Sequence, residues 1–366
     1  MPTTDTLAAQ LDRVAAFDSG PFPVVSLYLN LQPDQHGRDN FEPFLRKALA
    51  ERLRTYGAEG PERKSLEQDA EKIRTYVNEL DAAVNGLALF ACSGAELFEA
   101  IAVAAPIPEH KLYISEQPHL YPLARLLDDF PRYAVVLADT HLARIFVVAG
   151  NRVVQTEQVE GTKTRRHRMG GWSQARYQRH IDNFHAQHAK EVVDTLARIV
   201  TDEAIPSIVV AGDEVIVPLL RDYMPKELTA RIIDTVKLDI RAPEHEVLEA
   251  TRAAMQEKDA QTDRERVDAL IGAYRGNGLA VAGIEDTRAA LELGQVDELL
   301  VTGAPAAIEV HAKAATTTAG ERSPGEQAAD ELIAKARQTA ATVRIVQDAA
   351  LLSAVGGVGA FLRFKL

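Results

Sequence analysis

The sequence predicts an α/β protein built from three domains, each of which mixes strands and helices. Three observations predict this class. The chain has 366 residues, which is longer than one ordinary hydrophobic core requires. Short apolar runs alternate with longer helical stretches along the whole chain. Turn-forming residues interrupt this alternation near two positions, so we place the domains at residues 1–130, 131–275 and 276–366.

The first predicted domain contains three strands and two helices. A Pro-rich turn precedes its first apolar run, and Asn85-Gly86 introduces the second. Gly, Ala, Glu and Pro residues between the two helices indicate a loop over 57–65. The expected strands are Val24–Leu31, Leu87–Cys92 and Lys111–Ser115, and the expected helices lie at about 40–56 and 61–80.

The second predicted domain begins with a three-stranded meander, because Gly150-Asn151 turns the chain into a third strand at Val153. The apolar run Ser207–Ala211 suits a buried parallel strand. A charged helix runs from Pro243 to about Tyr274, and its alternating acids and bases indicate a solvated face. The remaining expected elements are the strands Tyr133–Ala138 and Ala143–Ala149, a long helix at about 173–201, and a helix after Gly212-Asp213.

The third predicted domain follows the turn at 276–278. Its strands and helices alternate in βαβ order, which predicts an α/β/α sandwich. The Thr-, Gly- and Ser-rich stretch Thr316–Pro324 predicts a mobile loop. The expected strands are Leu279–Gly283, Glu298–Thr302 and Val343–Gln347, and the expected helices are Ile284–Leu293 and Pro324–Thr339.

Composition narrows the functional classes. The chain is 46% hydrophobic and 26% charged, as is typical of globular proteins. The single cysteine, Cys92, excludes an internal disulfide framework and fits a reducing compartment. The first residues lack the apolar core of a secretory signal, and no segment has the apolar length of a membrane span. We therefore expect a cytoplasmic protein that does not contact a membrane.

A basic segment stands out against the formal net charge of −12. It reads KTRRHRMGGWSQARYQR and contains no acidic residue between Glu160 and Asp182. The overall negative charge opposes indiscriminate nucleic-acid binding, so any RNA contact must be focused on such a patch. Its candidate RNA-binding residues are Lys163, Arg165, Arg166, Arg168, Gly170, Gly171, Trp172, Arg176, Tyr177 and Arg179.

The mixture of residue types in this segment favours RNA as its ligand. Arginines neutralise phosphates and release counterions. Trp172 and Tyr177 offer flat faces on which bases can stack, and the paired glycines let the backbone approach a ligand closely. The alternative is a solvated basic loop that precedes an amphipathic helix.

A histidine cluster and a glycine cluster do not meet the requirements of a metal site and a phosphate-binding loop, respectively. His185 and His188 share a helical face and His180 lies nearby, but no cysteine or well-placed carboxylate completes a metal-ligand set. The glycines Gly356, Gly357 and Gly359 lack the lysine and the following helix of a phosphate loop, so a turn explains them better. We expect neither a metal nor a cofactor.

Several segments match one known family. GNGLAVAGIEDTRAALELGQVDELLVTG at 276–303 and VGGVGAFLRF at 355–364 are similar to that family's third domain, and NGLALF at 85–90 falls where the family has a similar strand. GGWSQARYQR at 170–179 aligns without gaps with the pattern Gly-Gly-Gln-Ser-x-x-Arg-Phe-x-Arg. The whole chain resembles the archaeal and eukaryotic class-1 peptide-chain release factors and their bacterial relatives, including Pelota and the ribosome hibernation factor Balon. The resemblance implies three α/β domains arranged as in these factors.

Peptide release by the family mechanism is in doubt. In the family, the Gly-Gly-Gln tip enters the peptidyl-transferase centre, where the glutamine helps to place a water against the peptidyl-tRNA ester. Here Trp172 occupies the glutamine position, and an indole has one N–H donor and no acceptor. Gln174 lies two residues further on and is the one candidate for a catalytic residue. Whether the chain is an enzyme stays open, and we favour a non-enzymatic role.

Stop-codon reading is also in doubt. The family reads codons with an Asn-Ile-Lys-Ser tip between two helices and with a Tyr-x-Cys-x-x-x-Phe segment. The first is reduced here to Arg63-Lys64-Ser65, which we assign to a loop facing the decoding region, with an exposed helix N-terminus as the favoured alternative. In the second, Tyr113 remains, but Ser115 and His119 replace the cysteine and the phenylalanine.

These departures favour a factor that binds the ribosomal A site without codon recognition and protects idle ribosomes, as Balon does. Two alternatives stay open: a rescue hydrolase of peptidyl-tRNA, and an adaptor that binds RNA or a translational GTPase outside the A site. The resemblance further implies that the third domain faces a translational GTPase, elongation factor Tu in the Balon-like branch. We expect the loop Thr316–Pro324 to be free for that contact.

Overall fold

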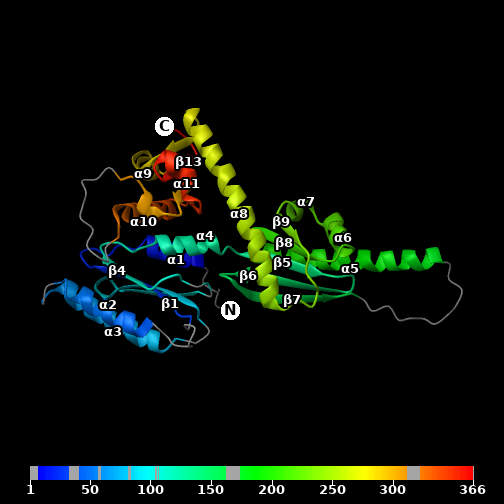
Figure 1. Cartoon of the computed structure of the whole chain (residues 1–366), viewed down its shortest axis with the longest axis horizontal. Helices are drawn as coiled ribbons and strands as arrows, with labels where there is room; N and C mark the ends of the chain where they lie inside the picture. The colour runs from blue at the N-terminus through cyan, green and yellow to red at the C-terminus, as the bar shows by residue number, and fades with distance from the viewer. Residues whose placement is uncertain are drawn as a thin grey trace. The chain divides into compact units, whose positions relative to one another are not determined.

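The computed structural model describes residues 7–32, 41–56, 59–80, 84–103, 105, 107–161, 174–310 and 322–365. The chain forms two compact units. The composite unit joins residues 1–129 to residues 260–366, and the central unit contains residues 130–259. The composite unit holds two sheets and the central unit holds one, with helices packed against each sheet (Figure 1). The predicted α/β class is confirmed.

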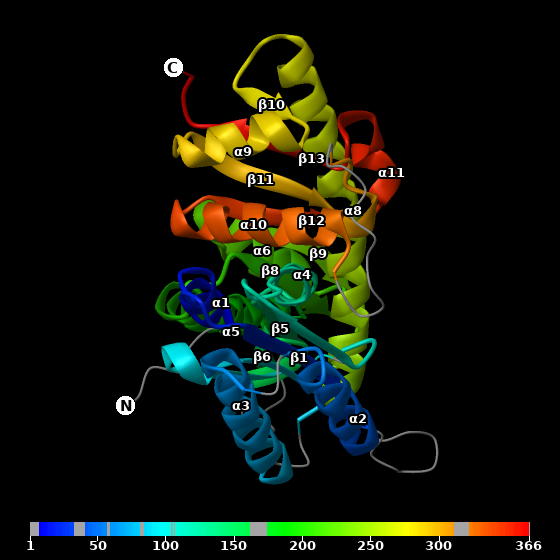
Figure 2. The same ribbon diagram turned by 90° about the vertical axis from the view of Figure 1, so that its left-hand side faces the viewer.

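The first sheet is antiparallel and has the strand order β3-β2-β1-β4. Figures 1 and 2 show α2 and α3 together below this sheet, and their apolar side chains form one core with its strands. The prediction missed β3, which follows the short turn Ser93–Ala95 as a hairpin partner of β2. The elements are β1 (Val24–Asn30), α2 (Phe41–Leu53), α3 (Pro61–Asn78), β2 (Gly86–Cys92), β3 (Leu97–Val103) and β4 (Lys111–Ser115).

Two short helices of the first hundred and thirty residues were also missed. They are α1 (Leu7–Ala15) and α4 (Tyr121–Asp129). Both pack against each other and against α10 (Pro324–Gln338), which belongs to the third sheet's layer. Because their apolar faces are buried by a distant segment, the first and third parts of the chain form one unit.

The third sheet is an α/β/α sandwich with the strand order β10-β13-β11-β12. On one face α9 and α10 pack side by side, and on the other α8 (Glu244–Arg275) and α11 bury Leu270 and Leu352 against Leu300. The parallel pair β11 and β12 is connected through α10, and β13 lies antiparallel to β11. The elements are β10 (Ala280–Ala282), α9 (Ile284–Glu292), β11 (Val296–Thr302), α10, β12 (Thr342–Val346), α11 (Ala349–Leu352) and β13 (Val358–Leu362).

The central sheet has the order β7-β6-β5-β8-β9. The meander is antiparallel, whereas β5, β8 and β9 are parallel to one another. The prediction missed β9, whose residues are only partly buried. The elements are β5 (Tyr133–Ala138), β6 (Leu142–Ala149), β7 (Arg152–Glu160), α5 (Gln174–Asp202), β8 (Ser207–Gly212), α6 (Ile216–Tyr223), α7 (Lys226–Thr229), β9 (Ile232–Val236) and α8 (Glu244–Arg275).

The composition of the charged helix α8 indicated a solvated helix. The structure shows that α8 also has buried positions. A stripe that includes Val247, Thr251 and Met255 is buried in the central unit, and Val267 and Leu270 are buried in the composite unit. The apolar positions are sparse, so the surrounding charges conceal the stripe in the sequence. In the part of the chain that the structure describes, neither α8 nor any other helix has the length and apolarity needed to cross a membrane.

Candidate nucleic-acid interface

The basic segment connects the end of β7 to the start of α5. Lys163, Arg165, Arg166, Arg168, Gly170, Gly171 and Trp172 lie outside the described residues. Gln174, Arg176, Tyr177 and Arg179 lie in the first two turns of α5. The described residues on either side of 162–173 are Gly161, after β7, and Gln174, the first residue of α5.

The segment leaves the central sheet from a well-defined root. The backbone N–H of Gly161 donates to the carbonyl of His141 at 2.8 Å. His141 lies in the turn between β5 and β6, where the Asp139 carboxylate accepts the N–H groups of His141 and Leu142 at 2.7 Å each. This side-chain cap on a tight turn holds the point of departure in place.

A buried histidine of α5, His188, packs against Gly161, where the chain leaves β7. His188 is 3% exposed, and a Cβ atom at Gly161 would lie 3.2 Å from its Nδ1. Burial lowers the pKa of His188, so its ring is neutral at neutral pH. The ring of His185 lies edge-on to that of His141, with the centroids 6.4 Å apart. Among the described residues, these histidines form no metal-binding group.

Helix α5 carries the far end of the segment away from the central core. Its later turns, including Val192, Leu196 and Val200, are buried against the sheet. Its first turns extend past the sheet edge, as Figure 1 shows for α5. At a rise of 1.5 Å per residue, Gln174 lies about 21 Å along the axis from His188. The positive end of the helix dipole is thus presented at a distance from the core.

Arg63, Lys64 and Ser65 belong to the first turns of α3 and not to a loop. Lys64 is exposed, whereas the Arg63 guanidinium already binds Glu67 and the carbonyl of Leu53. Ser65 is 3% exposed, and its Oγ accepts the N–H of Gly94 at 2.8 Å. The favoured alternative, an exposed helix start, describes Lys64, while Ser65 has a structural contact.

A buried carboxylate, Asp330 of α10, organises the segment that follows β4. Asp330 is 1% exposed. One of its oxygens accepts the N–H groups of Leu120 and Tyr121 at 2.8 Å each, which caps the start of α4. The other lies 2.8 Å from Nδ1 of His119 and forms an ion pair with Arg322. These hydrogen bonds and the ion pair with Arg322 offset the cost of removing the Asp330 carboxylate from water.

Arg322 extends this network to the end of the first sheet. It is 7% exposed and donates to Ser115 Oγ at 2.6 Å and to the carbonyl of Gln117 at 3.2 Å. On the sheet side, Ser26 Oγ accepts the N–H of His119, and the Tyr28 hydroxyl donates to the His119 carbonyl at 2.5 Å.

The network changes the interpretation of Tyr113, Ser115 and His119. The rings of Tyr113 and His119 are in contact, with centroids 4.4 Å apart. Burial raises the pKa of Tyr113 to about 12. Of these three positions, which match the codon-reading segment of the resembling family, Ser115 and His119 bind Arg322 and Asp330 and so connect the first and third parts of the chain, while Tyr113 contacts the His119 ring. Asp330 and Arg322 could not be predicted as members of this network, because nothing near them in the sequence shows that they meet residues 115–121.

The predicted loop Thr316–Pro324 is likewise corrected at its end. Residues 316–321 lie outside the described part. Arg322 is buried, and Ser323 begins α10 with a reciprocal cap in which Ser323 and Glu326 each bind the other's backbone N–H. Its last residues are therefore engaged within the composite unit and not free for contact.

Two regions of the chain match models of known protein families. Residues 118–256 match the model of bacterial archaeo-eukaryotic release factor family 10, and residues 262–366 match eRF1 domain 3. Peptide chain release factor subunit 1 of Aeropyrum pernix is 24% identical over 305 residues, which cover 77% of this chain and 75% of that protein. The uncharacterized protein Rv2629 of Mycobacterium tuberculosis is 27% identical over 277 residues, 71% of this chain and 73% of Rv2629.

Among solved structures, Dom34 of S. cerevisiae aligns over 81% of this chain and 93% of its own, with 11% identity and a TM-score of 0.44. Two separate family models, one for the central region and one for the third, agree with relatives that cover about three quarters of the chain. The resemblance seen in the sequence is thereby confirmed. The chain is a homologue of the archaeal and eukaryotic class-1 peptide-chain release factors.

Proposed function

We propose that this protein binds the ribosomal A site without recognising stop codons and protects idle ribosomes, in the manner of a Balon-like hibernation factor. The observation that carries this proposal is the Asp330 network. Ser115 and His119, at positions that match codon-reading residues, are instead bound to Arg322 and Asp330. Side chains held in this buried network cannot turn outward to a codon without breaking it.

The basic segment supplies the contact with ribosomal RNA in this proposal. The N-terminal turns of α5 extend past the sheet edge (Figure 1), and the sequence of these turns includes Arg176 and Arg179. Arginines in the segment, together with the positive end of α5, attract phosphates. The formal net charge of −12 of the chain as a whole opposes phosphate binding outside this patch.

Ribosome co-sedimentation at increasing salt tests the RNA contact. Replacing Arg165, Arg166 and Arg168 together with alanine removes three phosphate contacts. The slope of log K against log salt is negative, and its magnitude should fall by about 2–3. The matched control replaces Arg152, Arg241 and Arg252, three exposed arginines of the same unit, with the same change in net charge. Equal ribosome binding by both triple variants would reject the segment as the RNA contact.

The partner is proposed to be a translational GTPase, elongation factor Tu, bound by the third domain. This follows the family resemblance and the match of residues 262–366 to eRF1 domain 3. The predicted three-domain division at 130 and 275 also stays a proposal, in which the first and third domains pack into the composite unit.

A second candidate function is hydrolysis of peptidyl-tRNA. It is favoured by one observation: Gln174 is the first residue of α5, only two positions beyond Trp172. An amide at this end of the helix is close in sequence to the Gly170-Gly171 pair, where the family places its glutamine.

A further inference from the structure

We propose that the groove between α3 and β3 binds an extended peptide of a partner protein, which adds a strand to the free edge of β3 and carries alternating apolar and basic side chains. This inference is independent of the ribosomal function. It rests on the topology of the first sheet, on the shape of the groove beside it and on the charges that border it.

The edge of β3 is suited to strand addition. β3 is the terminal strand of its sheet and pairs with β2 over all seven residues, without a bulge. Its other edge pairs with no strand among the described residues. Sheet edges are commonly protected by lysine, proline or a bulge, and the sequence LFEAIAV of β3 contains none of these. Its one charge, Glu99, binds Arg13 of α1 at 2.6 Å.

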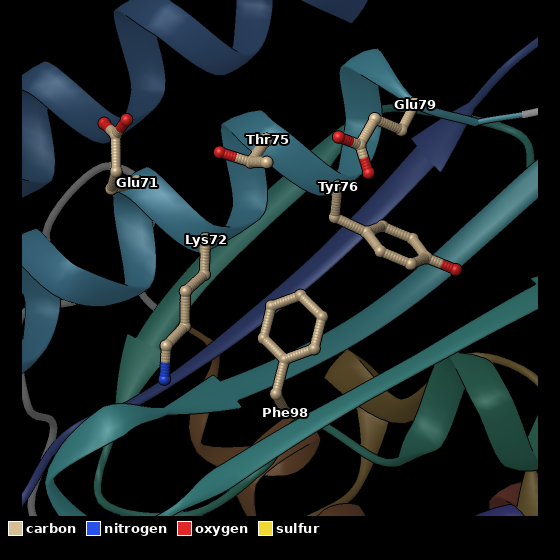
Figure 3. A pocket seen from close by; sticks show the side chains of 6 residues that line it. All are labelled: Glu71, Lys72, Thr75, Tyr76, Glu79 and Phe98. Atoms are coloured by element: carbon tan, nitrogen blue, oxygen red, sulfur yellow. The ribbon is translucent and has the colours of Figure 1, made fainter.

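A groove lies beside this edge, between the strand and α3. It has a volume of about 330 Å³ and is lined by Glu71, Lys72, Thr75, Tyr76 and Glu79 of α3 and the residue after it, and by Phe98 of β3 (Figure 3). The rings of Tyr76 and Phe98 meet edge-on with centroids 5.7 Å apart. Both rings are only partly buried, so an incoming apolar side chain can cover them.

The register of an added strand brings its side chains to the groove. Alternate residues of a strand point to opposite faces of the sheet. Phe98 and Ala100 of β3 face the core between the sheet and helices α2 and α3. A strand paired with β3 therefore directs every second side chain toward the same face, where the groove opens, while its backbone binds the free edge.

The charges favour a basic peptide over a nucleic acid. Figure 3 shows the carboxylates of Glu71 and Glu79 on the helical wall and one ammonium group, that of Lys72. All three side chains are exposed. Arg74 lies 3.8 Å from Glu71 and neutralises it in part. The aromatic floor alone could stack a base, but the lining holds two carboxylates and one ammonium group, and this excess of negative charge opposes a phosphate backbone.

The test measures binding of a defined probe to the full chain. The probe is a fluorescent peptide of alternating valine and lysine, read by anisotropy. Three comparison probes are the same peptide with glutamate for lysine, the same peptide with alternate backbone N-methyl groups, and an oligouridine of ten nucleotides. We expect saturable binding of the valine–lysine peptide, and a loss of at least ten-fold for each comparison probe.

Variants locate the site. Thr75→Arg places bulk and positive charge in the groove from an exposed position, and we expect it to weaken peptide binding at least ten-fold. Gln68→Arg, at an exposed position of α3 outside the groove lining, is the matched control and should leave binding unchanged. Circular dichroism checks that both variants fold.

Four results of the binding measurements overturn the proposal. They are no saturable binding of the valine–lysine peptide, equal binding of the N-methylated peptide, equal loss in Thr75→Arg and Gln68→Arg, and tighter binding of the oligouridine. Self-association of the chain that Thr75→Arg abolishes would assign the edge to a second copy and would also overturn it. Protection of β3 amides from hydrogen exchange by the peptide would support strand addition directly.

Discussion

The Asp330 carboxylate lies 2.8 Å from Nδ1 of His119, across 211 positions of sequence. The pair joins the third sheet's helix α10 to the segment that leads into α4. The same carboxylate binds two backbone N–H groups and Arg322, so removing its charge leaves several buried groups without their partner. This relationship makes the first and third parts of the chain interdependent in stability.

We expect Asp330→Asn to destabilise the composite unit by about 3–5 kcal/mol, because the buried Arg322 loses its counter-charge. The measurement is urea unfolding, followed by circular dichroism and by a spectroscopic label on α10. Asp268→Asn, at an exposed position of α8, is the control and should change stability by less than about 0.5 kcal/mol. Equal stabilities of the two variants would contradict the structural role of the network.

Asp128 predicts a pH dependence of stability. Its carboxylate accepts the N–H of Ile345 at 3.1 Å, and burial raises its pKa to about 7. The folded state thus binds this proton more tightly than the unfolded state does. Its contribution to stability is therefore greatest below pH 4 and is lost as the pH rises toward 7, by up to about 4 kcal/mol.

We expect Asp128→Asn to remove this slope, because the amide oxygen still accepts the Ile345 N–H and carries no charge. Asp69, Asp129 and Asp263 also have raised pKa values, so the quantity to compare is the difference between the wild type and the variant. Unfolding free energies at pH 5 and pH 8 measure it. Parallel pH profiles of the two proteins would refute the prediction.

A substitution at Trp172 distinguishes the contribution of base stacking from that of charge in the proposed RNA contact. We expect Trp172→Ala to weaken ribosome binding by about 1–3 kcal/mol, as for loss of one stacked base. The salt slope should stay unchanged, since no phosphate contact is removed. Trp172→Phe is the control and should retain most of the affinity. A changed slope in Trp172→Ala would mean that the residue acts by shaping the basic segment.

The catalytic question turns on Gln174. If the protein protects ribosomes without chemistry, peptidyl-tRNA on ribosomes stays intact in its presence, whatever codon occupies the A site. The measurement is release of labelled peptide from stalled complexes. Efficient release that Gln174→Ala abolishes would establish the hydrolase instead. Gln187→Ala, at an exposed position further along α5, controls for a general effect on the helix.

The proposed GTPase contact is tested in the full chain. Removing the whole third domain would uncover the faces of α1 and α4 that α10 buries, so its result would not report on binding alone. Deleting residues 312–320 leaves Arg322 and the α10 cap in place. We expect weaker capture of elongation factor Tu in pull-downs by this variant, and full capture by Lys64→Ala. Undiminished capture after the deletion would remove this segment from the partner surface.

The sequence predicted elements whose burial repeats locally. The strands at 133–138 and 207–211 are continuous apolar runs, and the helices at 284–293 and 324–339 alternate with strands in βαβ order. All of these are present within one or two residues of the expected bounds, and the strand at 207–211 is buried and parallel to its neighbours, as expected. Local patterns were sufficient here because each element carries its own apolar face.

Elements and contacts that depend on distant partners were not predictable. The short helices α1 and α4 bury their faces against α10, and the apolar positions of α8 become visible as a stripe only when two sheets pack on it. The residues Ser115, His119, Arg322 and Asp330 have no shared local pattern, since more than two hundred positions separate the two groups.

The composition and motif of the basic segment, the tryptophan in place of the family's glutamine, and the family itself could all be read from the linear chain. The engagement of the codon-reading positions could not, because a buried charge is stable only with partners that folding brings to it from another part of the chain. The same holds for the free edge of β3 and its groove, which exist only once strand order places β3 at the end of its sheet.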